Sequence, residues 1–153
     1  MIDLEQEARA AWQAFAERYG PLFAGFDPGK AVIEVLPPPH RPGPLPEGKQ
    51  AVFAFFWPDG NVFLYVAYAG PRSGPRFQVQ HYSPGGSPSN LAKRLLEAKE
   101  ALGLETLDRL SVGAWMRQHL ARVHFLLPSE WGRDIGKLLK GYLKERWQPL
   151  LGG

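Results

Sequence analysis

The sequence contains no cysteine and only two methionines among its 153 residues. Without cysteine, the chain has no disulfide bond, no thiolate ligand for a metal ion and no cysteine nucleophile. It also lacks an apolar run of about 20 residues, the length that a membrane-spanning helix requires. Its first residues, MIDLEQEARAAW, are acidic and lack the apolar segment of a secretory signal. These absences predict a cytoplasmic protein that does not enter a membrane.

Proline, in contrast, is abundant, with 15 residues. Together with many leucine, alanine, arginine and glycine residues, this resembles the composition of heat-adapted proteins, whose loops gain proline. The formal net charge of +3 is too small to predict a strong attraction to nucleic acid or membranes. The charge is unevenly distributed, however, because acidic residues outnumber basic ones in 1–20 and basic residues outnumber acidic ones in 121–153.

The clearest structural signal is residues 52–69, VFAFFWPDGNVFLYVAYA. Two arms rich in Phe, Val and Tyr flank Pro58-Asp59-Gly60, which predicts a β-hairpin with a type I turn and with Gly60 in the left-handed region. Neither arm alternates apolar with polar residues, so both faces of the hairpin must be covered. We therefore place this hairpin at the centre of the sheet.

Strict alternation assigns the side chains of each arm to the two faces of the sheet. On the second arm it places Phe63 and Tyr65 on one face, and Leu64 and Val66 on the other. Apolar faces of predicted helices are available to cover these side chains. If all the helices pack on one face, the second face must be buried in an isologous homodimer, because monomers do not leave so large an apolar patch in water.

The remaining elements follow from capping residues, from glycine and proline, and from apolar periodicity. Asp3 and Gln6 form a capping box before the first helix, and Ser89 or Asn90 caps a later one. The expected elements are helices at 4–19 and 91–102, strands at 31–36, 76–82 and 121–127, one or two short helices within 104–120 broken near Gly113, and a last helix capped by Pro128-Ser129. An antiparallel sheet of about four or five strands, built on the aromatic hairpin and packed against three or four helices, is a single α+β domain of residues 1–153.

The last helix carries a basic stripe formed by Arg133, Lys137, Lys140 and Lys144. Their spacing of three and four residues places all four side chains on one helix face, opposite the apolar face. Such a stripe can bind phosphates or an acidic partner. A solvated helix face is the simpler interpretation, and the neighbouring Asp134 and Glu145 weaken the positive field.

A second candidate is the loop before the helix at 91–102. A helix N-terminus offers free N–H groups to an anion. The residues of this candidate anion-binding loop are Gly85, Gly86, Ser87, Ser89, Lys93 and Arg94. The loop has neither a P-loop ending nor a GxGxxG pattern, so an ordinary turn and helix cap is the simpler interpretation.

The residues needed for catalysis or metal binding show no recognised spacing. Histidines 40, 81, 119 and 124 form no HExxH pattern and no pair four residues apart. His81 and His124 lie on predicted strands and can face each other, but satisfied histidines within a sheet are the simpler interpretation. Acid–base chemistry would have to use residues such as Glu34 and Glu97. We therefore expect no metal site and no cofactor.

This lack of a catalytic pattern favours a non-enzymatic interaction protein that binds a protein partner or a second copy of itself. The alternative is a protein that binds nucleic acid or a phosphate-bearing ligand through the basic stripe. A second alternative is an enzyme whose active site is assembled from residues scattered along the sequence.

Overall fold

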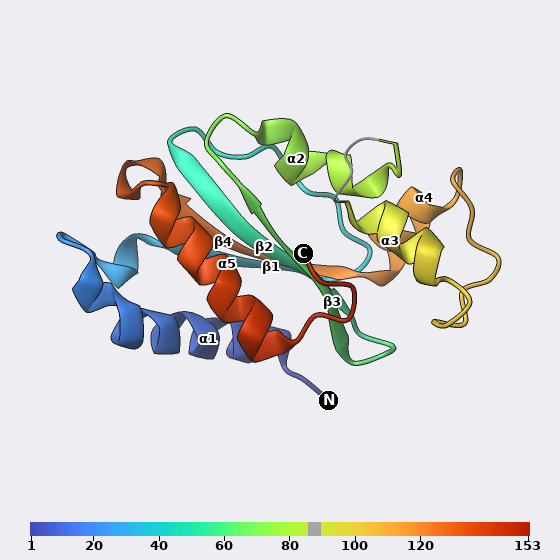
Figure 1. The fold of residues 1–153 in the computed structure, drawn as a ribbon, viewed down its shortest axis with the longest axis horizontal. Helices are drawn as coiled ribbons and strands as arrows, with labels where there is room; N and C mark the ends of the chain where they lie inside the picture. Colours follow the sequence, from blue (N-terminus) through green and yellow to red (C-terminus); the bar gives the residue numbers. More distant parts are fainter. Residues whose placement is uncertain (86–89) are drawn as a thin grey trace.

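Four antiparallel strands in the order β1-β4-β2-β3 form the sheet of the computed structural model, which describes residues 1–85 and 90–153 (Figure 1). The strands are β1 (Val32–Leu36), β2 (Lys49–Trp57), β3 (Val62–Ala69) and β4 (Ala121–Pro128). The α-helices within the described residues are α1 (Leu4–Tyr19), α2 (Gly74–Gln78), α3 (Leu91–Ala98), α4 (Val112–His119) and α5 (Arg133–Trp147). The predicted α+β class is confirmed.

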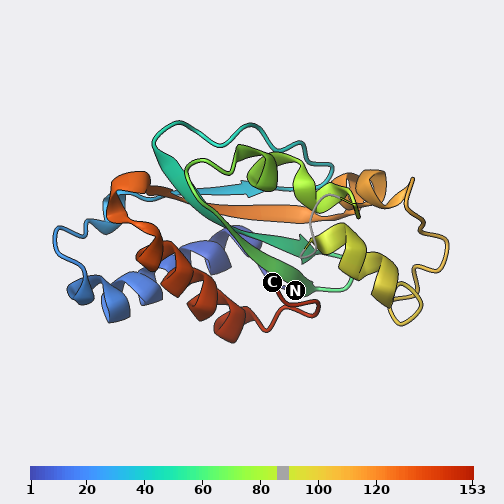
Figure 2. The ribbon, with the colours of Figure 1, turned by 45° about the horizontal axis from the view of Figure 1, so that its top comes forward.

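Helices cover both faces of the sheet, which gives three layers (Figures 1 and 2). One core lies between the sheet and the pair α1 and α5, and it buries Phe15 against strand residues such as Val52. The other lies between the sheet and α2, α3 and α4, and it buries Leu95 and Met116 against Phe53. The expectation that both faces of the hairpin are covered is confirmed. Because the helices are divided between the faces, the sheet does not require a dimer to cover it.

The prediction that both hairpin arms lie at the centre of the sheet is wrong for the second arm. The two central strands are β4 and β2, and β3 lies at one edge of the sheet, as β1 does at the other. The outer edge of β3 is nevertheless paired, because Leu151 N donates to Leu64 O (2.9 Å) and Val66 N donates to Gly152 O (3.0 Å). The segment after α5 therefore protects an apolar edge that would otherwise expose free backbone groups.

Strict alternation also fails within β3, because a β-bulge interrupts the pairing with β2. Phe55 pairs with Tyr65, but Phe56 pairs with Phe63, which leaves Leu64 as the additional residue. Phe63 consequently packs in the core on the α1 and α5 side, while Leu64 and Tyr65 both belong to the opposite core. A bulge shifts the alternation by one residue, and the sequence carries no signal for it.

The hairpin turn also differs from the prediction at one residue. Asn61, not Gly60, adopts the left-handed conformation, with a φ of 50°. Asparagine tolerates this region better than most residues. Gly60 is suited to its position for a packing reason instead, because a Cβ there would lie 2.9 Å from the Trp57 ring.

The predicted strand at 76–82 is wrong, because this segment forms α2 and a 3-10 turn at Gln80–Tyr82. Pro75 lies in the first turn of α2, where proline favours a helix start. Phe77 is buried while Val79 is 48 % exposed. Two apolar residues separated by one polar residue fit a strand, but they do not distinguish it from a helical turn.

The starts of α1 and α3 agree with the predicted caps, whereas α3 ends at Ala98 and not at residue 102. The Asp3 side chain accepts from Gln6 N at α1, and Asn90 accepts from Lys93 N at α3. The region 104–120 holds one described α-helix, α4, which Gly113 does not break. Helix α5 begins later than predicted, after Gly132 rather than at Ser129, because a 3-10 turn occupies Ser129–Trp131.

Candidate functional site: a basic pocket beside helix α5

A cavity of about 520 Å³ lies between the first half of α5 and the turn that joins β3 to α2. Arginine and lysine side chains dominate its lining, and no acidic residue belongs to it. The lining residues are Gln50, Tyr68, Gly70, Pro71, Arg72, Ser73, Arg76, Ser129, Arg133, Lys137 and Lys140. We call this cavity the basic pocket, and it combines five cationic side chains from three separate parts of the chain.

The floor of the basic pocket is a hydrogen-bonded pair of side chains from β2 and β3. Tyr68 donates its hydroxyl hydrogen to Gln50 Oε1 (2.7 Å), and Gln50 Nε2 donates to Gly132 O (2.8 Å) and to Pro128 O (3.2 Å). These bonds attach the start of α5 to the sheet. Gly136 permits a close approach, because a Cβ at this residue would overlap the Tyr68 ring and lie 2.9 Å from Gln50 Oε1.

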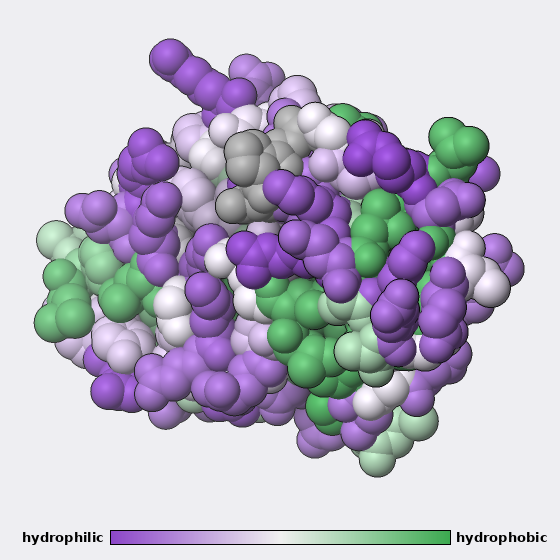
Figure 3. Space-filling model, turned by 45° about the vertical axis from the view of Figure 1, so that its right-hand side comes forward, coloured by the Kyte–Doolittle hydropathy of each residue, from purple (hydrophilic) through white to green (hydrophobic). Residues whose placement is uncertain are grey.

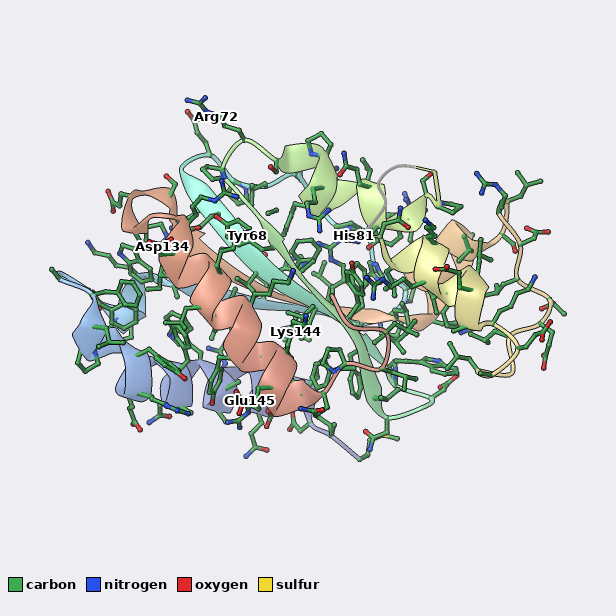
Figure 4. All side chains as sticks on the ribbon, in the orientation of Figure 1. Tyr68, Arg72, His81, Asp134, Lys144 and Glu145 are labelled. Carbon is green, nitrogen blue, oxygen red and sulfur yellow. The ribbon has the colours of Figure 1, made fainter. Side chains whose placement is uncertain are left out.

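Two walls of cations border this floor, one from α5 and one from the segment that follows β3. Arg133, Lys137 and Lys140 come from successive turns of α5, and Lys137 Nζ lies 5.5 Å from the centre of the Tyr68 ring. Arg72 and Arg76 form the second wall, where Arg76 Nε donates to Tyr68 O (3.0 Å). In Figure 4 the exposed Arg72 side chain extends from the turn beyond β3 and away from Tyr68.

The charges within the pocket repel one another. Burial lowers the pKa of Lys140 below its usual value, and nearby cations lower this pKa further, among them Lys144, Arg76 and Lys137. Each of these charges favours the neutral amine over the ammonium form. A ligand with negative charge would remove this repulsion.

The predicted basic stripe is therefore only partly assembled at one place. Arg133, Lys137 and Lys140 line the pocket, whereas Lys144 Nζ donates to Gly153 O (3.3 Å) beside the C-terminal segment. Neither Asp134 nor Glu145 is part of the pocket lining. In Figure 4, Glu145 lies toward the opposite end of α5 from Arg72.

Sequence reasoning missed Arg72 and Arg76. Both lie in PRSGPR, where Arg76 is the first residue of the strand expected at 76–82 and Arg72 precedes it. An available signal was that a proline- and glycine-rich turn carries two arginines without an acidic residue. Their meeting with α5 depends on tertiary packing across about 60 residues of sequence.

The candidate anion-binding loop falls largely outside the described residues, which do not include Gly86, Ser87 and Ser89. Lys93 N makes the ordinary capping bond to Asn90 Oδ1 (2.8 Å). Arg94 Nη1 donates to Leu151 O (2.7 Å) and so contacts the segment that covers β3. Gly85, Lys93 and Arg94 are not among the residues that line the basic pocket.

A buried polar chain lies on the opposite face of the sheet, centred on the fully buried Arg122. Arg122 donates to Tyr82 Oη (3.1 Å), to Phe77 O (2.8 Å) and to His124 Nε2 (2.9 Å). Tyr82 Oη in turn bonds to His40 Nε2. The three acceptors are neutral groups, and the guanidinium also lies 4.7 Å from the Phe53 ring centre. Hydrogen bonds and aromatic rings thus surround this cation where a carboxylate is usual.

Burial keeps the histidines of this region neutral. It lowers the pKa of His40 to about 4 and the pKa of His81 to about 3, with smaller contributions from nearby arginines. Burial also holds the pKa of His124 well below its usual value. The 3.1 Å contact between His124 Nδ1 and Glu34 is therefore a hydrogen bond from a neutral ring rather than an ion pair. In this hydrogen bond the neutral ring carries its proton on Nδ1. The other ring nitrogen, Nε2, is therefore able to accept the hydrogen bond from Arg122.

The prediction that His81 and His124 both lie on strands, from which they can face each other, is wrong. His81 lies in the 3-10 turn at Gln80–Tyr82, and only His124 lies on a strand. Both rings instead contact Phe53, with centroids 5.5 Å and 6.5 Å away. Within residues 1–85 and 90–153, no group of three or more histidine, aspartate or glutamate residues is placed to hold a metal ion.

A second cavity, of about 740 Å³, lies at the end of α1 and includes Trp12, Phe23 and Phe26 in its lining. We call it the α1 recess.

On the side of α3 and α4, hydrophobic areas lie among hydrophilic residues (Figure 3). Across the described parts of the chain, no helix has the length and apolar character needed to cross a membrane.

No protein-family model, characterised protein or solved structure matches this chain. Its function must therefore be inferred from the chemistry of these surfaces.

Proposed function

We propose that this protein binds phosphate-bearing ligands in the basic pocket. The observation that carries the proposal is the convergence of five cations on one cavity of about 520 Å³ whose lining contains no acidic residue. This volume falls within the range of small-molecule sites, about 300–1,000 Å³. The predicted stripe supports a binding role because three of its four residues belong to this lining.

The side chains of the pocket match the chemistry of a phosphate group. Arginine offers two parallel N–H donors to phosphate oxygens, and lysine adds a mobile point charge. Arg72 and Arg76 supply the first type of donor on one wall, and Lys137 and Lys140 the second type on the other. Ser73 and Ser129 add hydroxyl groups that donate to phosphate oxygens. A pocket lined by like charges is unfavourable, and a bound anion stabilises it.

Binding of a protein partner is a second candidate function, and the α1 recess supports it. Aromatic side chains at a concave surface are typical of protein interfaces. Trp12 is largely buried, while Phe23 and Phe26 are partly exposed there. The recess does not indicate the chemistry of a partner as specifically as the basic pocket indicates that of a ligand.

The proposal is tested by titrating isotope-labelled protein with pyrophosphate at low salt while recording backbone amide resonances. We expect shifts confined to the residues around Gln50, 68–76 and 129–140. Lys137→Glu combined with Lys140→Glu should weaken binding about a hundredfold or more, since each of the two charge-assisted hydrogen bonds contributes about 1.5–3 kcal/mol. Lys30→Glu is the matched control, because Lys30 is exposed and lies outside the pocket lining. The absence of shifts in these segments would refute the proposal.

A further inference from the structure

Building on the proposed function, we infer that the basic pocket selects a compact ligand with at least two linked phosphate groups, such as a diphosphate or triphosphate moiety, over a single phosphate. The basis of this selectivity is that the cations of the lining form two rows, one along α5 and one on the segment 72–76.

The row on α5 is too long for one phosphate. Arg133 and Lys140 are seven positions apart, and at 1.5 Å per residue their backbones are separated by about 10 Å along the helix axis. A single phosphate carries its oxygens on one phosphorus atom, so it contacts both ends of this row only if both long side chains bend toward it along the helix. A chain of linked phosphates lying along α5 can reach Arg133 and Lys140 together, with Arg72 and Arg76 on its other side.

The charges in the pocket lead to the same ligand class. One phosphate monoester carries about −1.5 to −2 at neutral pH, which leaves about three of the five positive charges uncompensated. Burial is the main cause of the lowered pKa of Lys140, and repulsion by Arg76 and Lys137 within the pocket lowers this pKa further. Only a ligand with several negative charges within a short distance neutralises both rows.

A nucleic-acid strand fits the pocket less well. Proteins that bind single strands usually combine cations with exposed aromatic rings on which bases stack. The only aromatic residue of the pocket lining is Tyr68, which is 7 % exposed and whose hydroxyl group is bonded to Gln50. The pocket therefore offers many contacts to phosphates and no stacking platform for a base.

The test compares inorganic phosphate, pyrophosphate and tripolyphosphate by isothermal titration calorimetry, with a single-stranded oligonucleotide as a further ligand. We expect affinity to rise about tenfold with each added phosphate, as each one reaches new cations. Two variants at the ends of the row sharpen the test, Arg133→Ser and Lys140→Met. Each variant should weaken the binding of tripolyphosphate about tenfold, whereas at most one of them should weaken the binding of inorganic phosphate.

Lys30→Met is the control, and thermal unfolding of each variant verifies that it is folded. The lysine side-chain NMR signal gives an independent measurement, because tripolyphosphate should raise the pKa of Lys140 toward its usual value. Equal affinity for phosphate and tripolyphosphate would overturn this inference but leave the proposed function intact. Absence of binding by every phosphate would overturn both. Tighter binding of the oligonucleotide than of tripolyphosphate would overturn the inference in favour of nucleic acid.

Discussion

Acid should destabilise this protein at a pH where most carboxylates are still ionised. His40 and His81 are buried, and burial lowers the pKa of these residues from 6.5 to about 4 and about 3 respectively. At a pH between 6.5 and its lowered pKa, each of these histidines carries a proton in the unfolded chain but not in the folded chain. Stability contributed by neutral histidines is therefore complete above pH 6.5 and is lost as the pH falls below that value.

The size of this effect follows from the two pKa values. One pKa unit corresponds to about 1.4 kcal/mol, so each histidine should cost about 2 kcal/mol of unfolding free energy between pH 7 and pH 5. His124, whose pKa is also lowered, adds to the loss. A total of about 4 kcal/mol or more is a large part of the 5–15 kcal/mol that is typical of globular domains.

Urea unfolding followed by tryptophan fluorescence at pH 7, 6 and 5 measures this loss. The slope below pH 6.5 should reach about 1.4 kcal/mol per pH unit for each buried histidine. His40→Gln should lower the stability at pH 7, because Tyr82 and Leu120 O lose a partner, and should reduce the slope by one histidine. Unfolding free energies that stay constant from pH 7 to pH 5 would show that these rings are not held neutral by burial.

Two further substitutions test the packing of the pocket and of the buried chain. Gly136→Ala should destabilise the protein by about 1–3 kcal/mol, because the new methyl group overlaps the Tyr68 ring. Gly141→Ala on the same helix is the control, because its methyl group meets open space and should stabilise the protein by up to about 1 kcal/mol. If both substitutions changed the free energy of unfolding in urea equally, the close packing of Gly136 against Tyr68 would be contradicted. Arg122→Met should raise the pKa of His124, because the Arg122 charge lowers it, and an unchanged NMR titration would contradict that assignment.

Local sequence patterns predicted most of the elements correctly. The Asp3 cap, the hairpin around Pro58-Asp59-Gly60 and the periodicity of the last helix each involve residues within a few positions of one another. Segment 76–82 was misassigned because its pattern was short and ambiguous. The bulge at Leu64 was missed because nothing in the local composition distinguishes a bulged residue from its neighbours.

The candidate site shows the same division between local and distant information. The cations of α5 were found from sequence because a helix places residues three and four positions apart on one face. That Lys144 would lie outside the pocket, and that Arg72 and Arg76 would complete it, could not be found in this way. These outcomes depend on how the β3–α2 turn and the C-terminal segment pack beside α5.

The sequence by itself determined the absence of cysteine chemistry, the aromatic hairpin and the basic face of the last helix. Tertiary structure alone decided which strands are central, how the helices are divided between the two faces, and which cations meet in one cavity. Periodicity and capping act over a few residues and can be read along the chain. The convergence of charges from distant segments depends on the packing of the whole core, which no short stretch of sequence encodes.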